Sequence, residues 1–208
     1  AAAAVGQIGL MAAYERAFAA HERQVAQVLL THADLADRRR YLNARHTLRT
    51  LLHLGVVPIV NENDTVAVEE LKFGDNDNLS ALTASLVEAD LLVVLSDVAG
   101  LYTHDPRLVP DAEIVRVTRA DDLAARAAAG PARSAVGTGG MASKVAAAQK
   151  AAAAGIPTVI ADGTAEGVLA AVFDPAVEIG TLVLADGAPL ARRKHWIAYT
   201  LTPAGARR

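Results

Sequence analysis

The order of apolar and polar positions predicts a chain of alternating strands and helices. Short apolar runs alternate with longer stretches whose apolar residues recur at helical spacing. We expect strands at 25–30, 56–60, 90–96, 113–117, 158–161 and 181–184. We expect helices at 3–20, from Asp34 to about 54, from Asn76 or Asp77 to 88, at 119–129, and from the glycines at 137–140 to the residue before Gly155.

This alternation is typical of an α/β domain with a mainly parallel sheet. The 90–96 segment agrees with this fold, because its continuous apolar run is of the kind that is buried on both faces of a parallel sheet. The 208 residues suffice for one large domain or two small ones.

Composition excludes several classes of function. The chain has no cysteine, which rules out disulfides, thiolate metal sites and a cysteine nucleophile. A net charge of -3 gives no bulk attraction to nucleic acid or anionic lipid. No apolar run reaches the roughly 18 residues of a membrane span, and the first 20 residues are typical of an amphipathic helix. We therefore expect a cytoplasmic protein without nucleic-acid or membrane partners.

A glycine-rich turn from Gly137 to Gly140 precedes the alanine-rich helix and places Lys144 in its first turn. Glycines let a backbone approach an anion, and a helix N-terminus offers it free N–H groups. The helix dipole disfavours a cation at this position, which suggests that Lys144 faces a negative ligand such as phosphate. The alternative interpretation is a flexible loop with a solvated lysine.

Two other phosphate-loop patterns fit this turn less well. The Walker A spacing is not matched. Gly137, Gly139 and Ala142 fit the dinucleotide fingerprint, with Asp162 as the following acidic residue. That fingerprint must follow a buried strand, however, and the segment 130–136 is a poor strand. We therefore rank the dinucleotide interpretation low.

Acidic and amide side chains gather in two clusters, 61–64 and 75–78. Neither cluster has the glycine and glutamate of a calcium loop. Helix capping explains one or two of the residues at 75–78, and a turn after a strand explains 61–64. Together the clusters favour a binding loop for a small polar ligand, since carboxylates can receive an ammonium group and amides a carboxylate. A zwitterionic amino acid presents both. Asp97, just past a strand, adds a polar group where open α/β sheets bind ligands.

Four motifs carry a family resemblance: NENDTVA, GDNDNLSAL, SDVAGLYTHDPR and GTGGMASK. In this order and at this spacing they resemble the glutamate 5-kinases of the amino acid kinase superfamily. The resemblance extends through Trp196. It implies a three-layer αβα sandwich with a mainly parallel central sheet in residues 1–187, followed by a basic linker at 188–208. It also implies phosphoryl transfer from ATP to the side-chain carboxylate of L-glutamate with Mg²⁺, which is the first step of proline biosynthesis. Feedback inhibition by proline and a homo-oligomer are implied as well.

The resemblance also implies roles for individual residues. Asn61, Asp64, Asp75 and Asn76 are expected to bind glutamate. Asp77 is expected to hold the phosphate-facing lysines in place, and Lys144 to contact the transferring phosphoryl group. The residues expected to bind ATP are Ser96, Asp97, Thr138, Gly139, Gly140, Met141, Ala142, Ser143 and Lys144. No protein residue is assigned to the metal ion.

Some features of the resembled family are missing from the sequence. Its first strand with a Lys-x-Gly-Ser-Ser loop, its Ser-Ser-Gly-Ala turn and its C-terminal PUA domain do not occur. We therefore expect an N-terminally incomplete kinase domain. One alternative is another member of the superfamily, acting on uridylate or carbamate, although NENDTVA argues against it. A further alternative is a non-catalytic remnant that senses glutamate or proline.

Overall fold

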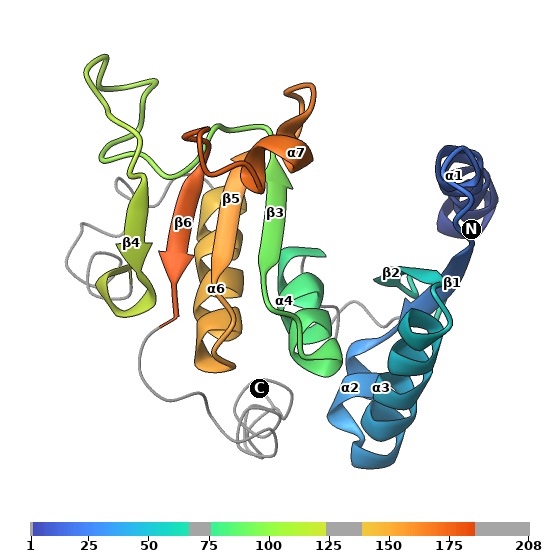
Figure 1. Cartoon of the computed structure of the whole chain (residues 1–208). Coiled ribbons are helices and arrows are strands. Elements are labelled where there is room, and N and C mark those ends of the chain that lie inside the picture. The colour runs from blue at the N-terminus through green and yellow to red at the C-terminus, as the bar shows by residue number, and fades with distance from the viewer. Residues whose placement is uncertain (1, 67–75, 124–138, 186–208) are drawn as a thin grey trace. The chain divides into compact units, whose positions relative to one another are not determined.

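The computed structural model describes residues 2–66, 76–123 and 139–185. These residues divide into two compact units, with the boundary between Leu79 and Ser80 inside one helix. Figure 1 shows the elements of each unit. The expected helix beyond residue 123, the glycine at 137 and the expected linker at 188–208 lie outside the described residues.

The first unit is built on a parallel pair of strands. Its elements are α1 (Ala2–Ala19), β1 (Val25–Leu30), α2 (His32–Ala36), α3 (Arg38–His53) and β2 (Val57–Glu62). The register of the pair runs from Val25 opposite Val57 to Leu30 opposite Glu62. Helix α1 contacts β1 and α3 contacts β2. Because β2 extends two residues beyond the expected end at 60, Asn61 lies within the strand.

The single helix expected from Asp34 is wrong, because two helices meet at Asp37. Thr31 caps α2 in a capping box: its Oγ1 accepts from the Asp34 backbone N–H at 3.2 Å, and Asp34 Oδ2 accepts from the Thr31 N–H at 2.8 Å. Asp37 is extended, with φ -80° and ψ 122°, and its Oδ1 accepts from the Arg40 N–H at 2.9 Å. An aspartate that satisfies a free N–H in this way starts a new helix.

The second unit contains a four-stranded sheet. Helix α4 (Asn76–Val87) enters it at Ser80. The other elements are β3 (Leu92–Ser96), β4 (Val117–Arg119), α6 (Gly139–Ala153), β5 (Thr158–Asp162), α7 (Val168–Val172) and β6 (Thr181–Leu184). The strand order is β3-β5-β6-β4 (Figure 1). The β3–β5 and β4–β6 pairs are parallel and β5–β6 is antiparallel, which confirms an α/β fold with mainly parallel strands.

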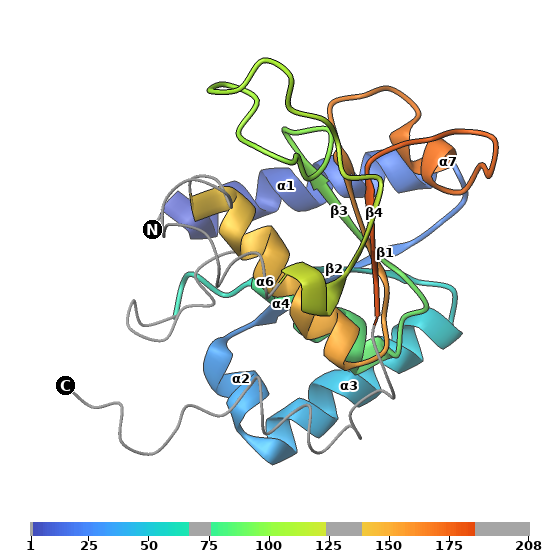
Figure 2. The ribbon, with the colours of Figure 1, turned by 90° about the vertical axis from the view of Figure 1, so that its left-hand side faces the viewer.

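Strand β5 is buried on both faces because its side chains alternate between two clusters. Ile160 belongs to the cluster that contains the alanines of α6, whereas Val159 and Ala161 pack with Val168 of α7. Figure 2 shows α6 on one side of the sheet and α7 on the other. The second unit thus has the helix–sheet–helix layering that was expected. The described strands, however, form two sheets, one in each unit.

Two segments differ from the expected elements. The strand expected at 113–117 is wrong: β4 begins at Val117, while 113–115 pair with the loop after β3. There the Thr103 N–H donates to the Glu113 carbonyl at 2.9 Å, and the Val115 N–H to the Leu101 carbonyl at 2.8 Å. These bonds satisfy backbone groups that would otherwise need a neighbouring strand. Helix α7 was not expected, because its five residues are too few for a helical pattern to be visible.

The loop after β3 is fixed to β6 through Gly100 and Thr181. The Leu101 N–H donates to the buried Thr181 Oγ1 at 2.8 Å. A Cβ on Gly100 would lie 2.7 Å from the same oxygen and 3.2 Å from the carbonyl carbon of Gly180. Only glycine fits this approach without displacing backbone.

We predict that Gly100→Ala destabilises the fold by about 1–3 kcal/mol, the usual cost of overpacking a filled site. The matched control is Gly9→Ala in α1, where an added Cβ meets no atom within 4 Å. This control should stabilise the chain by roughly 0.5–1 kcal/mol, because alanine is the better helix former. Urea unfolding followed by circular dichroism measures both, and equal stabilities of the two variants would contradict the prediction.

Candidate active site

A cavity of about 360 Å³ lies in the second unit, between the end of β3 and the start of α6. The residues that line it are Ser96, Asp97, Val98, Tyr102, His104, Asp105, Pro106, Arg107, Gly140, Met141 and Lys144. Five of the residues expected at the nucleotide are therefore brought together: Ser96, Asp97, Gly140, Met141 and Lys144. They come from segments more than 40 positions apart in the sequence.

The end of β3 is held by its neighbour β5. Ser96 pairs with Asp162, and the Ser96 carbonyl accepts from the Gly163 N–H at 2.7 Å. The Ser96 hydroxyl donates to Asp97 Oδ1 at 3.0 Å, which orients that carboxylate. Sheet pairing thus places the Ser-Asp pair at the carboxyl end of a parallel strand, where open α/β sheets bind ligands.

Asp162 itself takes part in a local turn. Its Oδ1 accepts from the Thr164 N–H at 2.8 Å and from the Thr164 hydroxyl at 2.7 Å, and these bonds lower the pKa of the carboxyl group. Asp162 does not line the cavity. The dinucleotide interpretation needs this carboxylate to face a ribose, so the geometry favours the simpler phosphate interpretation of the glycine turn.

Helix α6 begins at Gly139 and points its N-terminus at the cavity. Gly140 is exposed, and no atom lies within 4 Å of where its Cβ would be. Lys144 is half-buried and lines the cavity one turn further along. A lysine beside free N–H groups at a helix N-terminus is a suitable receptor for a polyphosphate.

Two further residues of the glycine turn, Ala142 and Ser143, are described and do not line the cavity. Ala142 is exposed, and the Ser143 hydroxyl donates to the Gly140 carbonyl at 2.9 Å, within the helix. Gly139 is the first residue of the helix. Thr138 lies outside the described residues. Only part of the expected ATP loop is therefore placed at the cavity.

The cavity wall also includes residues that sequence reasoning missed as site residues: Tyr102, His104, Asp105 and Arg107. Arg107 binds Asp105 in a bidentate ion pair, with Nη2 to Oδ2 at 2.8 Å and Nε to Oδ1 at 3.0 Å. The guanidinium lowers the pKa of Asp105, and the carboxylate raises the pKa of Arg107. These four residues belong to the SDVAGLYTHDPR motif, which was interpreted only as a sign of family resemblance. The motif could have indicated that they lie at the site.

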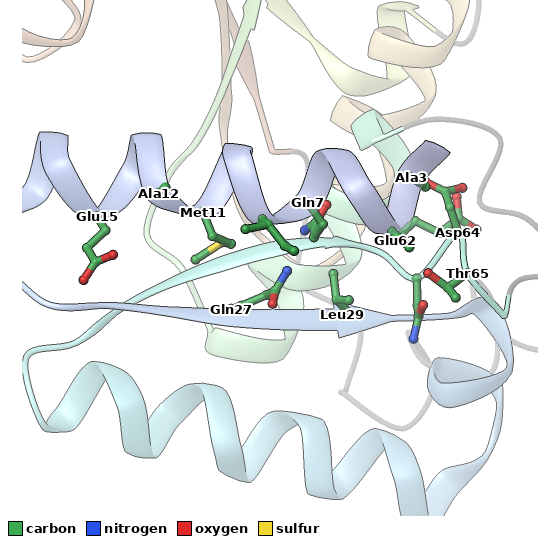
Figure 3. Close-up of a pocket in the computed structure, with 13 residues that line it drawn as sticks. Ala3, Gln7, Met11, Ala12, Glu15, Gln27, Leu29, Glu62, Asp64 and Thr65 are labelled. Atoms are coloured by element: carbon green, nitrogen blue, oxygen red, sulfur yellow. The ribbon is translucent and has the colours of Figure 1, made fainter. Parts of the chain in front are cut away.

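A second cavity, of about 470 Å³, lies in the first unit between α1 and the strand pair (Figure 3). Its lining residues are Ala3, Ala4, Gln7, Ile8, Met11, Ala12, Glu15, Gln27, Leu29, Glu62, Asn63, Asp64 and Thr65. Asp64 stands exposed in the turn after β2. Asn61 is half-buried within β2, and its Nδ2 donates to Gln7 Oε1 at 3.5 Å. The residues from α1 and β1 were not expected at this site.

The second cluster of acidic and amide residues lies at the start of α4. Asn76 is its exposed first residue, and Asp77 is half-buried in the first turn. Neither lines either cavity. Asp75 lies outside the described residues. The structure thus leaves the expected roles of these three residues as predictions.

Among the described residues, no three histidine or acidic side chains converge as ligands for a metal ion. No helix in the described part of the chain combines the length and apolarity that crossing a membrane requires.

A strand-end Ser-Asp pair facing a lysine at a glycine-led helix N-terminus is typical of an α/β phosphate-binding protein. Comparison with known proteins narrows this class. The chain belongs to the amino acid kinase family, whose family model matches residues 1–162.

The similar curated proteins are kinases of one kind. The chain is 57% identical over 205 residues to the glutamate 5-kinase of Pelobacter propionicus, covering 99% of this chain and 55% of that protein. It is 55% identical over 205 residues to the glutamate 5-kinase of Geobacter metallireducens, with the same coverage. The chain therefore spans about half the length of the curated relatives it matches.

Solved structures show the same fold at low identity. A carbamate kinase from Giardia lamblia bound to AMP-PNP matches with a TM-score of 0.64 and 20% identity, covering 87% of this chain and 70% of that one. A UMP kinase from Bacillus anthracis matches with a TM-score of 0.53 and 18% identity, covering 82% and 62%. At these identities the likeness concerns the fold alone.

We predict that Arg107→Ala raises the pKa of the Asp105 carboxyl group toward its ordinary value, because the guanidinium bonds are the main cause of its lowering. In the parent chain the pair stabilises the fold above the ordinary pKa, and this contribution is lost as pH falls through the lowered value. Carboxyl ¹³C NMR titration measures the shift. Arg116→Ala, whose partner is the exposed Glu178 at 4.0 Å, is the control and should leave Asp105 unchanged. An unaltered Asp105 titration in Arg107→Ala would contradict the assignment.

Proposed function

We propose that this chain carries the kinase region of an ATP-dependent glutamate 5-kinase, which phosphorylates the side-chain carboxylate of L-glutamate. The observation that carries the proposal is the convergence of Lys144, Asp97 and Ser96 on one cavity at the start of α6. The substrate is inferred from the curated relatives, which are named glutamate 5-kinases and align with 99% of the chain.

In phosphoryl transfer, the protein mainly positions the reacting groups and supplies fixed positive charge, with little covalent chemistry. Phosphoryl transfer spreads negative charge over the transferring group, and fixed positive groups stabilise it. Lys144 and the free N–H groups of α6 provide such charge. The Ser96–Asp97 hydrogen bond and the Asp105–Arg107 ion pair orient polar side chains elsewhere on the cavity wall.

Mg²⁺ neutralises phosphate charge in this chemistry. In kinase sites it is commonly held by one or two carboxylates together with substrate phosphates, and it does not need a complete protein cage. Asp97 on the cavity wall fits such a role.

On the amino-acid side, the first-unit cavity offers both kinds of partner. The carboxylates of Glu62 and Asp64 can receive the ammonium group of glutamate, while the neutral amide of Asn63 can receive a carboxylate. Asn61, Asp75 and Asn76 are proposed to complete this site, and Asp77 to orient the phosphate-facing lysine. These four roles rest on the family resemblance. Proline inhibition, homo-oligomerisation and a cytoplasmic location are proposed on the same ground.

The function is tested by ADP release from Mg·ATP with L-glutamate, L-aspartate, UMP or carbamate as acceptor. Glutamate-dependent turnover without turnover of the other acceptors is expected. Turnover with UMP or carbamate in place of glutamate would instead indicate another activity within the family. Binding of glutamate and ATP without turnover would favour a non-catalytic sensing chain.

We predict that Lys144→Ala lowers kcat about 10²–10³-fold, the usual loss for one charged donor in a preorganised site. Lys150→Ala, in the last turn of the same helix, is the matched control and should keep the parental rate. Steady-state kinetics measures both. A Lys144→Ala enzyme within twofold of the parent would remove this lysine from the mechanism.

We predict that Asp64→Ala raises the KM for glutamate far more than the KM for ATP. The reason is that Asp64 lines the first-unit cavity, whereas the glycine turn borders the other one. Glu166→Ala, which removes a carboxylate of similar exposure from a turn of the second unit, serves as control. A larger effect of Asp64→Ala on ATP would show that the first-unit cavity serves the nucleotide.

A further inference from the structure

In the side-chain amide of Gln7, on α1, the oxygen has a hydrogen-bond partner and the buried nitrogen has none among the described residues. Its Oε1 accepts from Asn61 Nδ2 at 3.5 Å. Its Nε2 is buried and has no hydrogen-bond partner among the described residues. A buried donor without an acceptor is costly, and native proteins rarely leave one unless another group, such as a ligand, satisfies it.

Gln7 also lines the first-unit cavity, from the side opposite the strand pair (Figure 3). Three carboxylates line this cavity, those of Glu15, Glu62 and Asp64, and no lysine or arginine is among the lining residues that the structure describes. Of these described residues, only neutral donors can receive a ligand's carboxylate. This makes each amide N–H in the wall important for binding.

We propose that Gln7 is a substrate-binding residue that donates its Nε2–H to a carboxylate of the amino-acid substrate. This inference rests on the proposed function and adds to it a residue from α1, outside the motifs that suggested the glutamate site. The contact with Asn61 occupies the Oε1 end of the amide and leaves Nε2 as the end available to a ligand. The terminal torsion of glutamine is broad, so the amide group can turn toward a ligand in the cavity that Gln7 lines.

Two substitutions separate ligand binding from a purely structural role. Gln7→Met keeps the shape of the side chain and removes the unsatisfied donor. Gln7→Glu keeps an acceptor for Asn61 Nδ2 and replaces the donor by a negative charge. If Nε2 serves only the ligand, loss of that donor costs the methionine variant little stability, and a lower melting temperature reports the lost Oε1 acceptor of Asn61 Nδ2.

The experiment measures L-glutamate binding to the chain by isothermal titration calorimetry, with the melting temperature of the ligand-free protein and the affinity for ADP measured in parallel. Both Gln7 variants should weaken glutamate binding roughly 10- to 100-fold, as expected when a hydrogen bond to a charged group is lost. Affinity for ADP should be unchanged. Gln24→Met, at an exposed glutamine just before β1, is the matched control and should bind glutamate like the parent.

The outcomes separate this inference from the function on which it rests. A parent chain that binds no glutamate would overturn both. A parent that binds glutamate, together with a Gln7→Met variant of equal affinity, would overturn the role of Gln7 alone. A Gln7→Met variant with a lower melting temperature and unchanged glutamate affinity would show that the side chain is structural.

Discussion

The close packing of α6 against the sheet of the second unit is the constraint on which the second-unit cavity depends. Ala147, Ala148 and Ala151 of the helix are fully buried against the sheet. Their single methyl groups let the helix axis lie close to β3 and β5, and this distance sets where Gly140 and Lys144 stand relative to the end of β3. Larger side chains at these positions would move the helix N-terminus away from Ser96 and Asp97, since a filled core transmits volume changes to the backbone.

The two cavities differ in charge in the way that two different ligands require. The second-unit cavity combines the positive groups that attract phosphates, Lys144 and a helix N-terminus, with the Asp97 carboxylate and an internally neutralised Asp105–Arg107 pair. The first-unit cavity has acidic side chains and neutral amides, which suits an ammonium-bearing ligand whose carboxylates bind to uncharged donors. Under the proposed function, the chain separates the charge requirements of a nucleotide and an amino acid between its two units.

The sequence predicted the strand–helix alternation well, because buried strands such as β3 and β5 show as continuous apolar runs. The sequence-based prediction was wrong where local hydrogen bonds determine the bounds of a helix or strand. Asp37 splits a continuous helical pattern through its own capping bond, and 113–115 pair with a loop that has no strand pattern. The family resemblance predicted Ser96, Asp97 and Lys144 at the nucleotide, and the structure brings all three to one cavity. Motif spacing could not predict Tyr102, His104 or Gln7, because their place depends on tertiary contacts that leave no periodic signal.

The central claim is that the two cavities bind different ligands, and amide chemical-shift mapping tests it most directly. Addition of a nonhydrolysable ATP analogue with Mg²⁺ should shift the signals of 96–98, 102–107 and 140–144, whereas L-glutamate should shift those of Gln7 and 62–65. Nucleotide-induced shifts confined to the first-unit cavity, or the same set of shifts with both ligands, would contradict the account.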